Sequence, residues 1–146
     1  MIALDTNVLV YAHRSEGEHY SKAKRLLQDL AEGTAAWAIP WQCFHEFFGV
    51  VTNPRLFRPP TPRAAALAQI EAWLSSPSLV VLCESARHWS TLKPPIQSGE
   101  IDGPKIHDAR IAALCLQHGV RELWSADRDF SRFTGLAAVN ALVGNG

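Results

Sequence analysis

The chain has 146 residues, of which 47% are hydrophobic, so it is long enough to form one compact domain with a buried core. Lysine plus arginine and aspartate plus glutamate number 14 each, which excludes a strong overall field that would attract nucleic acid or anionic membranes. Contact with a polyanion therefore needs a local basic patch. We expect a soluble cytoplasmic protein, because no apolar stretch is long enough to span a bilayer and the N-terminus lacks the pattern of a secretory signal.

Short apolar segments alternate with amphipathic ones along the first half of the chain. Met1–Leu4 predicts a buried strand that stops at Asp5, and a helix follows through Ala12. The spacing of apolar residues predicts a second helix over 19–30, which ends near Gly33. A second strand over 35–39 and a helix from Pro40 through Val51 come next.

Residues 53–62 contain four prolines together with Arg55 and Arg58, and this composition excludes regular structure. A loop of this length exceeds the usual connection in a compact domain and is more often functional or mobile than incidental.

The second half of the chain continues the alternation. We expect, in order, a helix over 64–74, a strand over 79–82, a helix over 85–92, an irregular segment over 93–105, a helix over 106–118, a strand over 122–125 and a fifth strand within 137–142. Strands that alternate with helices predict a parallel sheet covered on both faces.

The three cysteines are Cys43, Cys83 and Cys115, and each lies in an apolar stretch. Their odd number and wide separation argue against a disulfide framework or a zinc site. We predict that all three are buried thiols.

Acidic residues follow several of the predicted elements. Asp5 and Asp127 come after strands, and the carboxyl ends of parallel strands share one edge of a sheet. Asp108 lies near the start of a helix and Glu46 lies in the helix after the second strand, so both should face the same edge. Taken singly, an aspartate at such a position is more simply a helix cap. Glu46 stands among phenylalanines, where a charged group usually has a partner, although helical periodicity could also turn it to solvent.

Four carboxylates at one edge would repel one another and raise one another's pKa values unless cations bind between them. Oxygen ligands suit Mg²⁺ or Mn²⁺, and no histidine or cysteine pattern favours zinc. Such a metal can activate a water and neutralise the charge that develops on a phosphodiester. The pattern therefore predicts a metal site at this edge of the sheet.

Four segments of the chain, taken together, form a recognisable set. They are Ile2–Leu9, Glu46, Ile106–Ala113 and Ser125–Phe130. In this order and spacing they resemble the PIN-domain ribonucleases, and more narrowly the VapC-type toxins of prokaryotic toxin–antitoxin pairs. The resemblance covers essentially the whole chain and implies one domain over residues 1–146. It implies a three-layer α/β/α sandwich with a central parallel sheet of about five strands.

The resemblance also implies an activity, cofactors, partners and site residues. The activity is Mg²⁺-dependent endonucleolytic cleavage of RNA, with Mn²⁺ as a substitute, and the partners are a cognate antitoxin and a second copy of the chain. The catalytic acids implied by it are Asp5, Glu46, Asp108 and Asp127, of which Asp5, Asp108 and Asp127 hold the metal. Asn7 and Ser125 are supporting polar residues, and Asp129 is an additional acid whose role varies in the family. Ser125 stands where the family usually has threonine, and the hydroxyl is retained.

Arginines of the proline-rich loop over 53–62 and of two of these segments have the composition of an RNA-binding surface, because RNA is bound through phosphates and unstacked bases. The candidates are Arg55, Arg58, Arg110 and Arg128. Any one of them could equally be an ordinary solvated charge.

Three other functions stay open at this point. One is a PIN-fold RNA-binding module without catalysis, and another is a nuclease directed at DNA or flap structures. The third is a phosphatase with an aspartate nucleophile after its first strand, which the sequence disfavours because Asn7 stands where such enzymes carry a second aspartate.

Overall fold

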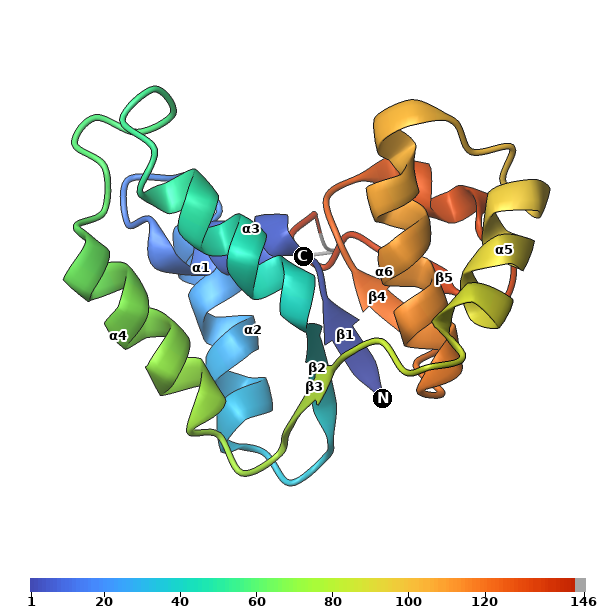
Figure 1. The fold of residues 1–146 in the computed structure, drawn as a ribbon. Coiled ribbons are helices and arrows are strands. Elements are labelled where there is room, and N and C mark those ends of the chain that lie inside the picture. Colours follow the sequence, from blue (N-terminus) through green and yellow to red (C-terminus); the bar gives the residue numbers. More distant parts are fainter. Residues whose placement is uncertain (144–146) are drawn as a thin grey trace.

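The computed structural model describes residues 1–143 and contains a five-stranded parallel sheet (Figure 1). Its strands are β1 (Ile2–Leu4), β2 (Trp37–Pro40), β3 (Leu79–Leu82), β4 (Glu122–Trp124) and β5 (Ala137–Val139). They lie in the order β3-β2-β1-β4-β5, and every neighbouring pair is parallel. The predicted α/β fold with five strands is confirmed.

Helices cover both faces of this sheet. They are α1 (Thr6–His13), α2 (Tyr20–Glu32), α3 (Trp41–Val51), α4 (Arg63–Leu74), α5 (His88–Ser98) and α6 (Ile106–Gln117), with short 3₁₀ turns η1 (Gly103–Lys105) and η2 (Arg128–Arg132). The connections from β1 to β2 to β3 step in one direction, whereas the connection from β3 to β4 steps back. Because such crossovers are right-handed, α1–α4 lie on one face and α5 and α6 on the other, as Figure 1 shows.

The direction of the connections reverses between β1 and β4, which pair in register from Ile2 with Glu122 to Leu4 with Trp124. Helices on opposite faces diverge from such a point and leave a crevice at the carboxyl ends of the two strands. The residues that follow β1 and β4 therefore define where a site can form.

The core lies on both sides of the central strands. All four residues of β2 are buried, as are Ala3 and Leu4 of β1. Phe47 of α3 packs edge-on against Trp73 of α4, with ring centroids 4.9 Å apart, so α4 is joined to the core through α3. Each fully buried side chain of this size stabilises the fold by about 1.5–3 kcal/mol.

The structure corrects the predicted boundaries of the fifth helix. The sequence predicted a helix over 85–92 and an irregular segment from Lys93, but α5 runs through Pro94 and Pro95 to Ser98. A proline removes its own N–H from the helical ladder, while burial of Pro95 and packing of Leu92 and Ile96 on the core favour continuing the helix.

The prediction of three buried thiols is wrong for Cys83, which is exposed, whereas Cys43 and Cys115 are buried. Cys83 follows β3, and β3 is an edge strand, so the chain leaves the sheet for the surface at this residue.

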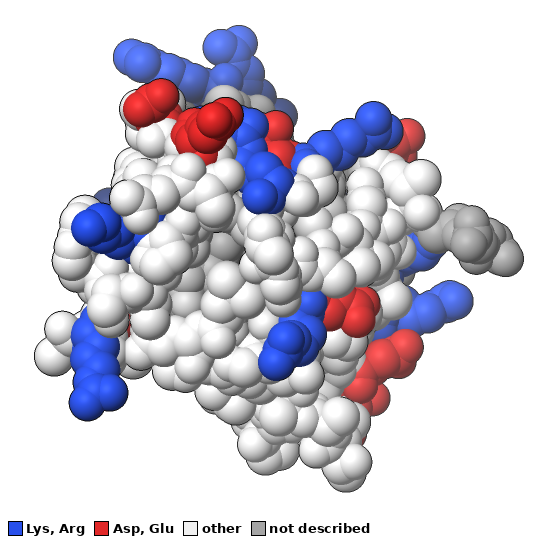
Figure 2. Space-filling model, turned by 90° about the vertical axis from the view of Figure 1, so that its right-hand side faces the viewer, with Lys and Arg blue, Asp and Glu red and all other residues white. Residues whose placement is uncertain are grey.

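The surface of residues 1–143 shows no broad basic face in the direction of α5 and α6. Figure 2 shows that Lys and Arg side chains are dispersed there among Asp and Glu, around a largely uncharged centre. Within this described part, no helix combines the length and the apolar character needed to cross a membrane.

Candidate metal centre

Four acidic residues reach one cleft at the carboxyl edge of the sheet. Asp5 follows β1, Glu46 lies in α3, Asp108 lies in the first turn of α6 and Asp127 follows β4. All four line a cleft of about 330 Å³. The strand order explains the meeting, because Asp5 and Asp127 flank the point where the connections reverse.

Asp5 is the most enclosed of these acids, with 6% of its surface exposed. It is the N-cap of α1, and its Oδ1 accepts a hydrogen bond from the backbone N–H of Thr6 over 2.7 Å. Burial raises the pKa of Asp5 to about 6; hydrogen bonds from Ser125 and Thr6 oppose this rise, and the charges of Glu46 and Asp108 add to it. A cation beside Asp5 would favour its ionised form.

A hydrogen-bonded network holds the second oxygen of Asp5. The hydroxyl of Ser125 donates to Asp5 Oδ2 over 2.7 Å and accepts from the backbone N–H of Asp127 over 2.9 Å. Asn7 Nδ2 lies 3.3 Å from Ser125 Oγ and 3.5 Å from Asp5 Oδ2, while Asn7 Oδ1 accepts from the backbone N–H of Ala126. Asn7 and Ser125 therefore tie the end of β4 to the end of β1.

Glu46 lies on the solvent-facing side of α3, although its neighbours Phe44 and Phe47 are buried. Glu46 is therefore not a charged residue enclosed among apolar side chains. The hydroxyl of Thr6 donates to Glu46 Oε2 over 2.7 Å, and this bond directs the carboxylate toward the cleft.

Asp108, Asp127 and Asp129 form the closest group of acids. One carboxylate oxygen from each lies within 4.8 Å of the others. The backbone N–H of Asp129 donates to Asp127 Oδ1 over 2.9 Å, which orients Asp127. Burial raises the pKa of Asp108, and the charges of Asp127 and Glu46 raise it further, while Lys105 lowers it.

These donors fit a hard divalent cation. Mg²⁺ binds oxygen at about 2.0–2.1 Å, so two of its ligands lie at most about 4 Å apart, and the oxygens of Asp108, Asp127 and Asp129 lie within 4.8 Å of one another. Neither cysteine nor histidine belongs to any group of metal-ligating type found among the described residues. The set matches the oxygen-rich sites of Mg²⁺ and Mn²⁺.

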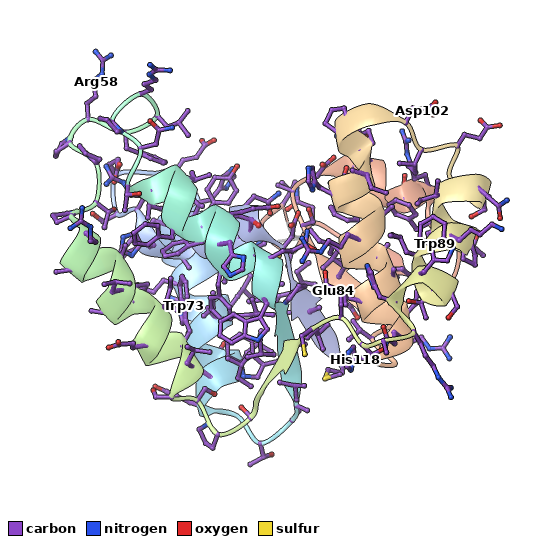
Figure 3. All side chains as sticks on the ribbon, viewed as in Figure 1. Arg58, Trp73, Glu84, Trp89, Asp102 and His118 are labelled. Carbon is purple, nitrogen blue, oxygen red and sulfur yellow. The ribbon has the colours of Figure 1, made fainter. Side chains whose placement is uncertain are left out.

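The four candidate arginines do not share one position. Arg110 pairs with Glu84, and both side chains are about one-third exposed. Arg128 is exposed and lines a second hollow of about 490 Å³ that adjoins Ser125 and Asp127. Figure 3 shows that Arg58 projects outward from the tip of the loop at residues 53–62. Arg55 of the same loop is also exposed.

The loop that carries Arg55 and Arg58 is anchored to the end of α1. Arg14 donates to the backbone carbonyl of Pro59 over 3.0 Å and to Thr61 Oγ1 over 3.1 Å. Its guanidinium also lies 4.4 Å above the ring of Phe57. The prediction of an irregular segment over 53–62 is confirmed, since α3 ends at Val51 and α4 begins at Arg63.

Two residues at the centre were not found from the sequence. One is Thr6, which follows the N-cap Asp5 and whose hydroxyl holds Glu46. Lys105 forms an ion pair with Asp129 and lies 4.0 Å from Asp108. Its spacing of three residues before Asp108 was the signal that could have found it.

Comparisons with known proteins give one family. Residues 2–136 match the family model of the PIN domain. Ribonuclease VapC43 of Mycobacterium tuberculosis is 35% identical over 136 residues, which are 93% of this chain and 92% of that protein. Ribonuclease VapC37 of the same species is 32% identical over 93% of this chain and 94% of its own length.

Solved structures show the same fold. VapC20 of Mycobacterium tuberculosis, described as a sarcin–ricin loop cleaving toxin, superposes with a TM-score of 0.67 at 20% identity, over 94% of this chain and 99% of that one. VapBC2 of Rickettsia felis, bound to a promoter DNA fragment, gives a TM-score of 0.64 at 20% identity, over 95% and 98% of the two chains.

Proposed function

Because this chain belongs to the PIN-domain family, and within it to the VapC ribonucleases, we propose that it is a Mg²⁺-dependent endoribonuclease and the toxin of a type II toxin–antitoxin pair. Residues 1–146 act as one nuclease domain in this proposal. The observation that carries it is the meeting of Asp5, Glu46, Asp108 and Asp127 on one cleft.

Asp5, Asp108 and Asp127 would hold the divalent cation, and Glu46 would complete the acidic set. When bound, Mg²⁺ or Mn²⁺ activates a water for attack on a phosphodiester and neutralises the charge that develops on the phosphate. The preference for these metals rests on the carboxylate donors that line the cleft.

The protein's own contribution is to orient the acids. Ser125 and Asn7 fix Asp5, while Thr6 fixes Glu46, so two carboxylates from different elements keep constant positions. Fixed positions lower the reorganisation needed when charge develops on the substrate. Asp5 has to be ionised for this role, and its raised pKa places that ionisation near pH 6.

The rest of the cleft supports a nucleic-acid substrate. Val10, Tyr11, Val50 and Ile111 form an apolar wall beside the acids. Such a wall suits an unstacked base, which is how RNA is usually bound in single-stranded segments. Arg128 stands beside Asp127 and is free to contact an adjoining phosphate, whereas Arg55 and Arg58 would meet the strand further away. Arg110 would have to leave Glu84 to do so.

The remaining parts of the proposal rest on the family. An antitoxin would bind the toxin and block the cleft, two copies of the chain would form a homodimer, and the protein would act in the cytoplasm, where RNA substrates occur.

Incubation of the purified protein with single-stranded RNA and single-stranded DNA, with Mg²⁺ or with a chelator, tests the activity. Asp5→Asn removes a catalytic acid, and Asp29→Asn is the matched control, because Asp29 is exposed on α2, away from the cleft. We expect Mg²⁺-dependent cleavage of RNA by the wild type and by Asp29→Asn alone. Cleavage that is absent, or equal in Asp5→Asn, contradicts the proposal. Preferential cutting of DNA favours a DNA-directed nuclease, and RNA binding without cleavage favours a silent binding module.

A further inference from the structure

Lys105 places a positive charge inside the acidic centre. It is the last residue of η1 and directly precedes α6. Its ammonium group forms an ion pair with Asp129 and lies 4.0 Å from Asp108 Oδ2. These two carboxylates are also two of the three that come within 4.8 Å of one another.

The position of Lys105 is otherwise unfavourable. It is the N-cap of α6, where the partial positive charge of the helix dipole repels a cation. Its side chain is 44% exposed, so it has room to extend into solvent instead. The carboxylates of Asp108 and Asp129 offset the repulsion and hold the ammonium against them.

An ammonium group and a divalent cation compete for the same oxygens. Lysine donates hydrogen bonds and neutralises one charge, whereas Mg²⁺ needs oxygen atoms as ligands. An oxygen of Asp129 that is paired with Lys105 is a poorer ligand, and the positive charge near Asp108 also repels an incoming cation.

We propose that Lys105 is a built-in counter-cation of the metal centre. Its ammonium group pairs with the Asp129 carboxylate and keeps this carboxylate from binding the metal. Its positive charge also weakens the binding of a divalent cation at Asp108 and Asp127. This inference rests on the proposed metal-dependent function. It also assigns Asp129 a role, which is to hold Lys105.

Binding of Mn²⁺ measured by calorimetry, with no RNA present, tests this proposal. Lys105→Met should lower the Mn²⁺ dissociation constant by about tenfold, as expected when a unit charge a few ångströms from a divalent ion is removed. Lys105→Arg keeps the charge and should stay near the wild-type value. Lys93→Met is the matched control, because Lys93 is exposed on α5 and has no ion pair among residues 1–143.

Asp129→Asn supplies the second arm. If Lys105 occupies Asp129, this variant changes the Mn²⁺ dissociation constant by less than about threefold, whereas loss of a true ligand should weaken binding by more than about tenfold. In the Lys105→Met background, where Asp129 is free to bind metal, Asp129→Asn should cancel the gain in affinity.

Either of two results overturns the inference: a Lys105→Met value within about threefold of the wild type, or a large loss in Asp129→Asn alone. A thermal unfolding curve reports whether Lys105→Met folds. If it does not, Lys105→Gln and Asp129→Asn still test the proposal. A wild type that binds Mn²⁺ and cleaves RNA, but shows either result, contradicts only the role of Lys105. Absence of Mn²⁺ binding in all variants contradicts both this inference and the metal dependence of the proposed function.

Discussion

The hydroxyl of Thr6 donates a hydrogen bond to Glu46 Oε2 over 2.7 Å, and this bond joins the first turn of α1 to α3. The neighbouring residue Asp5 is fixed by a backbone hydrogen bond from the same threonine. One residue therefore orients two acids of the cleft.

Thr6→Val removes the hydroxyl and keeps the shape, so we expect the rate of RNA cleavage to fall by about 10- to 100-fold, as is typical when a residue that orients a metal-site ligand is lost. Thr6→Ser keeps the donor and should retain most of the activity. Cleavage of a fluorescent RNA under single-turnover conditions measures the difference, and equal rates for Thr6→Val and wild type would show that Glu46 needs no support.

Asp108→Asn should reduce kcat/KM for RNA by about 100-fold or more, because a neutral amide holds the cation less tightly and the cation neutralises the charge of the transition state. Circular dichroism should show an unchanged fold, since Asp108 is only half-buried. Asp29→Asn, which removes an exposed acid from α2, serves as control. Activity of Asp108→Asn within about threefold of wild type would remove this residue from the proposed site.

Metal affinity should depend on pH through Asp5, whose pKa is raised to about 6 by burial. Below that pH a proton competes with the cation, so the Mn²⁺ affinity should rise by up to about tenfold per pH unit as the pH increases toward 6, and then level off. Burial also raises the pKa of Asp108, so a proton competes with the cation there at a higher pH than at an ordinary aspartate. Calorimetric titrations from about pH 5 to pH 7.5 test it, and a flat affinity across this range would contradict it.

Metal-free stability should show the opposite trend, because a group whose folded-state pKa is raised contributes stability at low pH that is lost as the pH rises through that pKa. The pKa of Asp5 is 3.8 in an unfolded chain and about 6 in the folded protein. The free energy of unfolding should therefore fall by on the order of 3 kcal/mol between about pH 4 and pH 6. Asp5→Asn should not lose this stability. Urea unfolding at neutral pH with a chelator present should therefore show that Asp5→Asn is more stable than the wild type. This difference should shrink below about pH 4. A variant that is less stable than the wild type at neutral pH would contradict the prediction.

The salt dependence of RNA binding separates the arginines. If Arg128 contacts a phosphate, Arg128→Ala should weaken binding and reduce the slope of log affinity against log salt by about one. Arg87, which is exposed and outside the cleft, is the matched control. RNA binding can be measured by fluorescence anisotropy in the Asp108→Asn background, where cleavage is weak. An unchanged slope would show that Arg128 contacts no phosphate.

The alternation of apolar and amphipathic segments was sufficient to predict the parallel sheet and most helix positions, since both depend on local periodicity. Where the prediction failed, tertiary packing decided the structure. α5 continues through Pro94 and Pro95 because one of its faces packs on the core, and Cys83 is exposed because β3 lies at an edge.

The acids of the cleft were found because strand ends are visible in a sequence, which is the case for Asp5 and Asp127. The contacts between them were not, because they join residues far apart in the chain. The bond from Thr6 to Glu46 spans 40 positions and the contact of Lys105 with Asp129 spans 24, so neither leaves a local pattern.

The adjacency of β1 and β4 also sets an order of events during synthesis. The hydroxyl of Ser125 reaches Asp5 across 120 positions, and Asp127 joins the cleft only when β4 has paired with β1. A growing chain that has been translated as far as α6 holds Asp5, Glu46 and Asp108 without the strand that completes the centre. We therefore expect RNA cleavage only from chains in which β4 has paired with β1 and has brought Asp127 to the other three acids.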